Sequence, residues 1–295
     1  MNGKTRSFVF AVTAILLWST VATAFKLSLR YLEPIQLLFY AAVFSCVALC
    51  IVLLAKREWR SLRTLSAKQV AMCALLGLLN PVAYYYILLE AYDRLPAQEA
   101  LSINYSWPIV LTILSSIFLK QVLHKLDLLA IVIAYSGVIV VATHGQPGSL
   151  DFSDRFGVGL ALGSTVLFAS YWLLNMGNRM EITITLFLAF AFAVVLLFIP
   201  VLLWHTPQVP DLRGIAGAAY IGFFEMGWTY LLWLGALRSS DNTASISIIA
   251  FVAPVISLLF IGLLLNEAIL VSTWVGLGLI VGGIGLRTIF AHRYN

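Results

Sequence analysis

Long apolar stretches recur along the whole chain and are separated by short polar breaks. They cover residues 8–29, 35–55, 70–92, 97–119, 126–143, 156–176, 182–203, 213–237, 243–265 and 271–290. Each is about 18–25 residues long, the length that a helix needs to cross a hydrocarbon layer of roughly 30 Å. Only 11% of this 295-residue chain is charged, whereas soluble domains carry about 25% charged residues. The sequence therefore predicts an all-α polytopic membrane protein with ten transmembrane helices, the first of which is retained rather than cleaved as a signal peptide.

The positions of the basic residues predict the orientation of the chain. If the N-terminus lies in the cytoplasm, 13 of the 18 Lys and Arg residues fall on the cytoplasmic side and five on the outer side. Cytoplasmic loops of membrane proteins are enriched in these residues, so both termini are expected in the cytoplasm. The net charge of +5 resides in these loops. We therefore expect membrane lipid, and not nucleic acid, around this chain.

The two halves of the chain resemble each other weakly. The segment from Tyr84 to Pro108 matches the segment from Tyr230 to Pro254 with the same spacing. We expect a first five-helix repeat at 1–145, an inter-repeat loop at 146–155 and a second five-helix repeat at 156–295. Because five is an odd number, the second repeat enters the membrane from the opposite side. Such an inverted 5+5 repeat is typical of secondary transporters that alternate access to a midplane site.

Several short motifs resemble a known superfamily. The run Leu-Leu-Trp-Ser-Thr at 16–20 and the pairs Lys-Gln at 120–121 and Asn-Glu at 266–267 resemble the EamA type of the drug/metabolite transporter superfamily. The run Asn-Tyr-Ser-Trp-Pro at 104–108 is similar to the aromatic amino-acid exporters of that superfamily. The resemblance implies export of aromatic and other neutral amino acids, or of similar small metabolites, across the inner membrane by alternating access. Export of other metabolites or drugs, or a channel-like facilitator, is the alternative.

Trp107 and Pro108 lie in the middle of the fourth predicted helix. Proline removes a backbone hydrogen bond and clashes with the carbonyl one turn earlier, and inside a membrane the freed carbonyl needs a partner or water. We therefore predict that Pro108 and its repeat mate Pro254 act as hinges, and that Trp107 and Asn104 line a substrate cavity. A kink that serves packing alone is the alternative.

Three further helices supply candidates for the same cavity. In the third helix Asn80 and Tyr84 are four residues apart and share a face, whereas Tyr85 and Tyr86 are expected only to pack. A tyrosine ring can stack on an apolar substrate while its hydroxyl donates a hydrogen bond. An interfacial aromatic belt or ordinary bundle packing is the alternative. The remaining candidates are Trp18 in the first helix and a stripe of the sixth helix formed by Ser164, Phe168, Tyr171 and Asn175.

Glu225 lies halfway along the eighth predicted helix, and Trp228 follows it. A charge at the bilayer centre is costly unless it faces water, a partner or a substrate. We predict that both residues line the cavity, where Glu225 pairs with a substrate ammonium group or carries a proton; a structural glutamate is the alternative. Glu90 and Glu99 lie near the outer ends of their helices, where we expect them to face the cavity or water at its outer mouth.

Sequence motifs of other protein classes are absent. No HExxH, GxSxG or P-loop motif points to an enzyme, and no filter motif points to a channel. We expect a small-molecule substrate, no cofactor and no metal. The sequence does not distinguish facilitated diffusion, proton exchange and solute exchange as the means by which transport is driven. The pairs Gly159 and Gly163, and Gly278 and Gly282, are expected to permit close helix approach, within a monomer or a homodimer.

Overall fold

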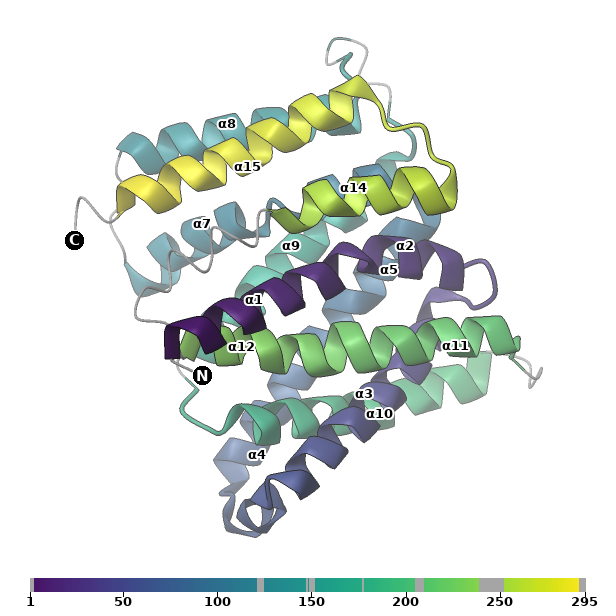
Figure 1. Ribbon diagram of the computed structural model, residues 1–295, viewed down its shortest axis with the longest axis vertical. Coiled ribbons are helices and arrows are strands. Elements are labelled where there is room, and N and C mark those ends of the chain that lie inside the picture. The colour runs from purple at the N-terminus through teal and green to yellow at the C-terminus, as the bar shows by residue number, and fades with distance from the viewer. Residues whose placement is uncertain are drawn as a thin grey trace.

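The computed structural model describes residues 3–120, 125–146, 148, 152–176, 178–204, 210–238 and 252–291, and within them all regular structure is helical. Figure 1 shows the helices as one bundle. The first part contains α1 (Gly3–Ser19), α2 (Val21–Ser28), α3 (Pro34–Ala55), η1 (Glu58–Thr64), α4 (Ala67–Gly77), η2 (Leu78–Ala83), α5 (Tyr84–Arg94), α6 (Ala97–Asn104), α7 (Trp107–Leu119) and α8 (Lys125–Ala142). The second contains α9 (Arg155–Met176), α10 (Ile182–Trp204), α11 (Leu212–Tyr220), η3 (Ile221–Thr229), α12 (Tyr230–Arg238), α14 (Val252–Leu265) and α15 (Val271–Ala291).

Most of these helices are suited to a lipid environment. Among the described residues, seven helical runs are long and apolar enough to cross a membrane: Thr5–Ser28, Pro34–Ala55, Ala67–Arg94, Ala97–Leu119, Lys125–Ala142, Arg155–Asn175 and Ile182–Leu203. Two shorter apolar helices follow at Val252–Leu265 and Val271–Leu286. Large apolar side chains such as Leu203 and Phe118 are 69% and 67% exposed, which suits contact with lipid and not with water. The chain is therefore a polytopic, all-helical membrane protein.

The observed helices agree with the apolar stretches in the sequence to within a few residues. Local signals explain several boundaries: α3 begins at Pro34 behind a capping box formed by Glu33 and Gln36, and α4 begins behind a second capping box formed by Ser66 and Gln69, each satisfying free amides of the first turn. The first part of the predicted helix at 243–265 lies outside the described residues. The count of ten helices and the inverted repeat therefore remain predictions.

Three of the membrane-crossing runs, and the helical run from Leu212 to Arg238, are interrupted in the interior of the bundle. A turn at Thr20 separates α1 from α2, and residues 105–106 separate α6 from α7. Pro108 stands in the first turn of α7, where proline is tolerated because that amide has no partner within the helix. The other two breaks are η2, which precedes α5 and is kinked where the backbone of Asn80 is extended (φ −148°, ψ 112°), and the π-helical segment η3, which precedes α12. Tyr84 and Tyr230, the pair matched by the sequence repeat, each begin the helix that follows one of these two breaks.

The close helix contacts use other glycines than the sequence motifs suggested. A Cβ on Gly137 of α8 would lie 2.4 Å from the Gly276 carbonyl oxygen of α15, and a Cβ on Gly222 of η3 would lie 2.4 Å from the Ala41 carbonyl oxygen of α3. Added methyl groups on the two predicted pairs would meet no described residue within 4 Å. The predicted close approach at Gly159, Gly163, Gly278 and Gly282 is therefore wrong for the part of the chain that the structure describes.

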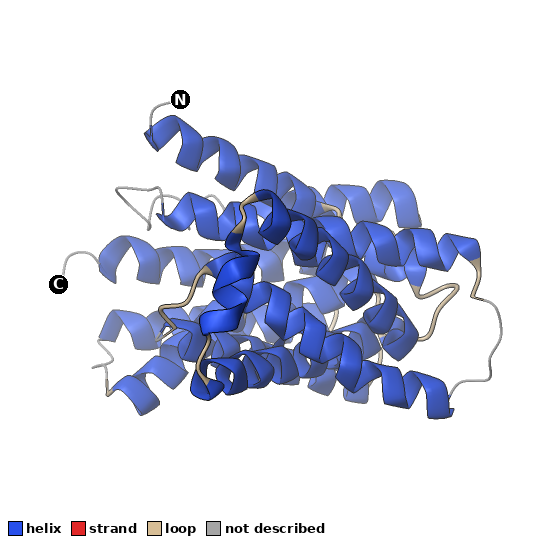
Figure 2. Ribbon diagram, turned by 90° about the horizontal axis from the view of Figure 1, so that it is seen from below, coloured by secondary structure: helices blue, strands red, loops and turns tan. Residues whose placement is uncertain are grey.

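The start of α1 and the end of α15 lie toward the same side of the bundle. Figure 1 shows the start of α1 and the end of α15 at one edge, and Figure 2 shows the same relation after a quarter turn. A membrane protein whose ends share a side crosses the membrane an even number of times. This arrangement suits the prediction that both termini share one compartment, and their cytoplasmic location stays a prediction.

Candidate functional site

Glu225 lies inside the bundle on the π-helical segment η3. Its residue is 7% exposed, and the Tyr85 hydroxyl donates a hydrogen bond of 2.9 Å to its Oε1. Its second carboxyl oxygen is buried and has no hydrogen-bond partner in the described part of the chain. Buried carboxyl oxygens are normally satisfied, and an exception calls for an explanation. Glu225 is thus held by one oxygen and available through the other.

Hydrogen bonds connect Glu225 to η2, the kinked segment that precedes α5. The Tyr85 and Tyr230 hydroxyl oxygens lie 3.3 Å apart, and Asn80 Nδ2 donates to the Tyr230 hydroxyl over 3.1 Å. Because a tyrosine hydroxyl has one proton and that of Tyr85 goes to Glu225, Tyr230 donates to Tyr85. A directed series of donors therefore runs from Asn80 through Tyr230 and Tyr85 to Glu225, and it joins the first half of the chain to the second.

A second polar group lies on the other side of α5. The Tyr84 hydroxyl donates to Asn104 Oδ1 over 3.3 Å, and Asn104 Nδ2 donates to Ser164 Oγ over 2.9 Å. Ser164 in turn donates to the Ala161 carbonyl oxygen on α9. Tyr84 and Asn104 are 5% and 9% exposed. The side chains of two adjacent residues of α5 thus point in different directions: Tyr84 faces α6 and α9, whereas Tyr85 faces η3 and α12.

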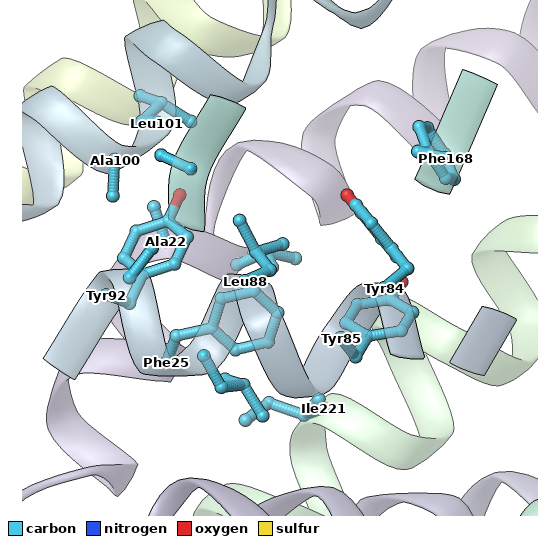
Figure 3. Close-up of a cluster of buried hydrophobic side chains, with 14 of the residues drawn as sticks. Ala22, Phe25, Tyr84, Tyr85, Leu88, Tyr92, Ala100, Leu101, Phe168 and Ile221 are labelled. Carbon is cyan, nitrogen blue, oxygen red and sulfur yellow. The ribbon is translucent and has the colours of Figure 1, made fainter. Parts of the chain in front are cut away.

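Aromatic rings surround these polar groups. The Tyr84 ring stacks on Phe168 with centroids 4.4 Å apart, and Phe168 meets Trp107 edge-on at 5.0 Å. The rings of Tyr171 and Trp172 continue the cluster, and the indole nitrogen Nε1 of Trp172 is buried with no hydrogen-bond partner among the described residues. In Figure 3, Tyr84, Tyr85 and Phe168 lie at one end of the buried hydrophobic cluster.

Trp18 approaches the same region from the first helix. It lies at the end of α1, just before the break at Thr20, and its ring centroid is 6.3 Å from that of Tyr230 and 5.3 Å from that of Trp233. The ring contact with Tyr230 connects Trp18 to the polar series that ends at Glu225.

The structure brings together most of the residues proposed from sequence and leaves two apart. Those that meet in this central cluster are Trp18, Asn80, Tyr84, Asn104, Trp107, Phe168, Tyr171 and Glu225. Trp228 lies apart, 38% exposed and in ring contact with Phe223 and Phe224. Asn175 lies half-buried near the end of α9 and makes no side-chain hydrogen bond to the cluster within the described residues.

Two sequence expectations about neighbouring residues are wrong. Tyr85 was expected only to pack, yet its hydroxyl donates the hydrogen bond that holds Glu225. Glu99 was expected to face the cavity or water, yet it is 1% exposed, and its Oε1 lies 2.5 Å from His144 Nε2 and accepts from Ser153 Oγ over 2.8 Å. Glu90, in contrast, is half-buried beside Arg94, with a closest N–O distance of 3.9 Å.

The fold and the central cluster together define a class of protein. A bundle of membrane-crossing helices, with interrupted helices that meet around buried polar and aromatic side chains, belongs to a transporter of small substrates. The chain is a member of the EamA-like transporter family, which it matches over residues 5–143 and 155–289. The resemblance to the EamA type of the drug/metabolite transporter superfamily is thereby confirmed. No group of three or more His, Cys, Asp or Glu side chains in the described residues is arranged to hold a metal ion.

Related proteins extend along nearly the whole chain. The chain is 28% identical to an uncharacterized transporter of Archaeoglobus fulgidus, over 95% of this chain and 97% of the relative. It is 24% identical to the uncharacterized transporter YvbV of Bacillus subtilis, over 96% and 92% of the two chains. It is also 24% identical to protein PecM of Dickeya dadantii over 68% of each chain. A solved crystal structure with 21% identity has a TM-score of 0.68 over 99% of both chains, which shows a shared fold.

Proposed function

We propose that this chain is a secondary transporter that exports aromatic and other neutral amino acids, or similar small metabolites, across the inner membrane by alternating access. The two stretches that match the family, 5–143 and 155–289, fit the proposed repeats at 1–145 and 156–295 and the inter-repeat loop between them. The excess of Lys and Arg on one side supports cytoplasmic termini. The substrate class is argued from the central cluster.

One observation carries the proposal: the central cluster contains an unused acceptor and an unused donor. Glu225 Oε2 and Trp172 Nε1 are both buried without a hydrogen-bond partner in the described residues. An amino acid offers the complement of both, because its ammonium group donates and its carboxylate accepts. The rings of Tyr84, Trp107 and Phe168 offer faces and edges on which an apolar or aromatic side chain can stack.

The contacts between the halves suggest where the transporter opens. Tyr85 and Asn80 come from the first half, whereas their partners Glu225 and Tyr230 come from the second. Movement of one repeat against the other, as in inverted-repeat carriers, must break or rearrange these hydrogen bonds. A substrate ammonium group that binds Glu225 would compensate for part of that loss. The breaks beside η2, η3 and Pro108 give the helix halves separate axes about which to move.

The experiment compares two aromatic residues of α7 in purified, reconstituted protein. Trp107 belongs to the central cluster, whereas Phe118 is 67% exposed on the outside of the bundle. We expect Trp107→Ala to lower the flux of radiolabelled phenylalanine at least severalfold, and Phe118→Ala to leave it unchanged, with equal reconstitution of both. Equal flux in the two variants would place Trp107 in the packing. If the unmutated protein shows no flux of phenylalanine but does show flux of another metabolite or of a drug, the alternative substrate class is favoured.

A further inference from the structure

A pocket lies away from the central cluster, where α2, α5 and α14 end. Its volume is about 230 Å³, and Figure 1 shows α2 and the end of α14 at the edge of the bundle opposite the chain ends. We call it the mouth pocket. It is lined by Lys26, Leu29, Arg30, Asp93, Leu265 and Glu267. The first four come from the first half of the chain and the last two from the second, so the pocket spans both halves.

The charged groups of the mouth pocket are not paired with one another. Within the described residues neither Lys26 nor Arg30 forms an ion pair, and neither does Asp93. Charges just outside the pocket behave differently, because Arg94 lies 3.9 Å from Glu90 and 3.8 Å from Asp154. The mouth pocket therefore holds two cations and two carboxylates, none of them in an ion pair within the described residues.

Glu267 is the most firmly positioned of these charges. Its Oε1 accepts a hydrogen bond of 3.1 Å from the backbone amide of Ala97, at the start of α6. Its Oε2 is buried and has no hydrogen-bond partner in the described part of the chain. The neighbouring backbone is fixed as well, because Gln98 bonds to Ala268 and Leu270. A rigid carboxylate with one unused, buried oxygen is thus presented at the pocket.

We propose that the mouth pocket binds a small zwitterion of the α-amino-acid type, with Lys26 and Arg30 on its carboxylate and Asp93 and Glu267 on its ammonium group. Equal numbers of the two charges favour a ligand that carries both over an ion of a single sign. Leu29 and Leu265 provide an apolar surface for a short side chain. The volume lies below the roughly 300–1,000 Å³ of drug-sized sites, so the ligand is a small metabolite. This inference goes beyond the proposed export function, because it assigns a binding site outside the central cluster.

The test reads occupancy at the mouth pocket itself. A cysteine is introduced by Leu29→Cys in a background whose three native cysteines are replaced by alanine, and its rate of modification by a maleimide is measured. Three probes are compared: L-leucine with both charges, leucinamide without the carboxylate, and N-acetylleucine without the ammonium group. We expect leucine to protect the thiol at roughly tenfold lower concentration than either analogue, because each analogue loses one charge-assisted contact.

Two variants assign the ends of the ligand. Lys26→Gln should raise the half-protecting concentration of leucine roughly tenfold and leave that of leucinamide unchanged. Asp93→Asn should raise the half-protecting concentration of leucine by a similar factor and leave that of N-acetylleucine unchanged. Should Lys26→Gln fail to fold, Arg30→Gln at an exposed position replaces it. The inference is overturned if all three probes protect the thiol at the same concentration, or if each variant raises the half-protecting concentrations of its two probes by the same factor.

The outcome separates this inference from the proposed function. We call the selective effects of the two variants, Lys26→Gln on leucine but not leucinamide and Asp93→Asn on leucine but not N-acetylleucine, the crossed pattern of protection. If the unmutated protein transports phenylalanine but this crossed pattern is absent, the mouth pocket is not a zwitterion site and the transporter proposal stands. If the crossed pattern is present but reconstituted protein shows no saturable flux, the pocket inference stands and the transporter proposal falls.

Discussion

Replacing Tyr85 with phenylalanine tests whether the buried series of hydrogen bonds stabilises the fold. The substitution keeps the ring, which is 1% exposed and packs edge-on against Phe25 at 6.2 Å, and removes only the hydroxyl. Glu225 then has neither oxygen bonded within the described residues, and Tyr230 loses the acceptor for its proton. Loss of a buried hydrogen bond that leaves its partner unsatisfied costs about 1–3 kcal/mol. We therefore expect Tyr85→Phe to lower the free energy of unfolding by about 2 kcal/mol.

The assay is equilibrium unfolding of the purified protein in bicelles, with Tyr135→Phe as the matched control. Tyr135 lies half-buried on α8 and makes no side-chain hydrogen bond in the described residues, so its hydroxyl should be worth a few tenths of a kcal/mol at most. A double-mutant cycle with Glu225→Gln isolates the coupling between the two side chains. The reasoning is refuted if Tyr85→Phe and Tyr135→Phe change the free energy of unfolding equally.

Three further predictions concern packing, binding and topology. Gly137→Ala should lower the free energy of unfolding by about 1–3 kcal/mol, because its methyl group meets the Gly276 carbonyl. Gly278→Ala, whose methyl group meets none of the described residues, should be neutral or stabilising by about 1 kcal/mol. Equal effects of the two substitutions would contradict the described contact of α8 with α15. Glu225→Gln should weaken phenylalanine binding severalfold in calorimetry, whereas unchanged binding with altered pH dependence of flux would assign the residue to proton transfer. Reporter fusions at residues 145 and 295 should report opposite sides, with 295 in the cytoplasm; an external signal from 295 would overturn both the orientation and the inverted repeat.

The helix positions followed from the sequence because they depend on one local quantity. A helix in lipid needs a sufficiently long apolar run, and the run from Ile182 to Leu203 supplies it whatever its neighbours are. The breaks are different, because they depend on tertiary contacts. The π-helical segment around Glu225 packs Gly222 against the carbonyl of Ala41, and nothing in residues 221–229 alone marks that contact.

The errors in the candidate site follow from the same cause. In an α-helix, residues three apart share a face, so α-helical spacing would put Trp228 on the same face as Glu225. In a π-helical segment the bonds run from i to i+5, so a residue three positions later has turned away, and Trp228 packs on Phe223. Tyr85 was missed because α5 is buried on two sides, so that adjacent residues both face inward.

Distant partners were also invisible in the sequence. Glu99 is buried because His144 and Ser153 fold over it from the segment between α8 and α9. No spacing rule connects residues 45 or more positions apart. The central cluster itself was largely predictable, because buried polar residues in membrane helices seek one another or a substrate, and Asn104 and Glu225 both do so.

Counter-flow in proteoliposomes measures the central claim most directly. Vesicles that contain the purified protein are loaded with unlabelled phenylalanine and placed in a trace of the labelled compound. A carrier that exposes one site alternately to the two sides should accumulate label transiently above its external concentration, because internal substrate returns the empty site to the outside. The same vesicles with Trp107→Ala should lose this overshoot. Label that rises to equilibrium without an overshoot, in proportion to its concentration and without saturation, would contradict alternating access and indicate a channel-like facilitator.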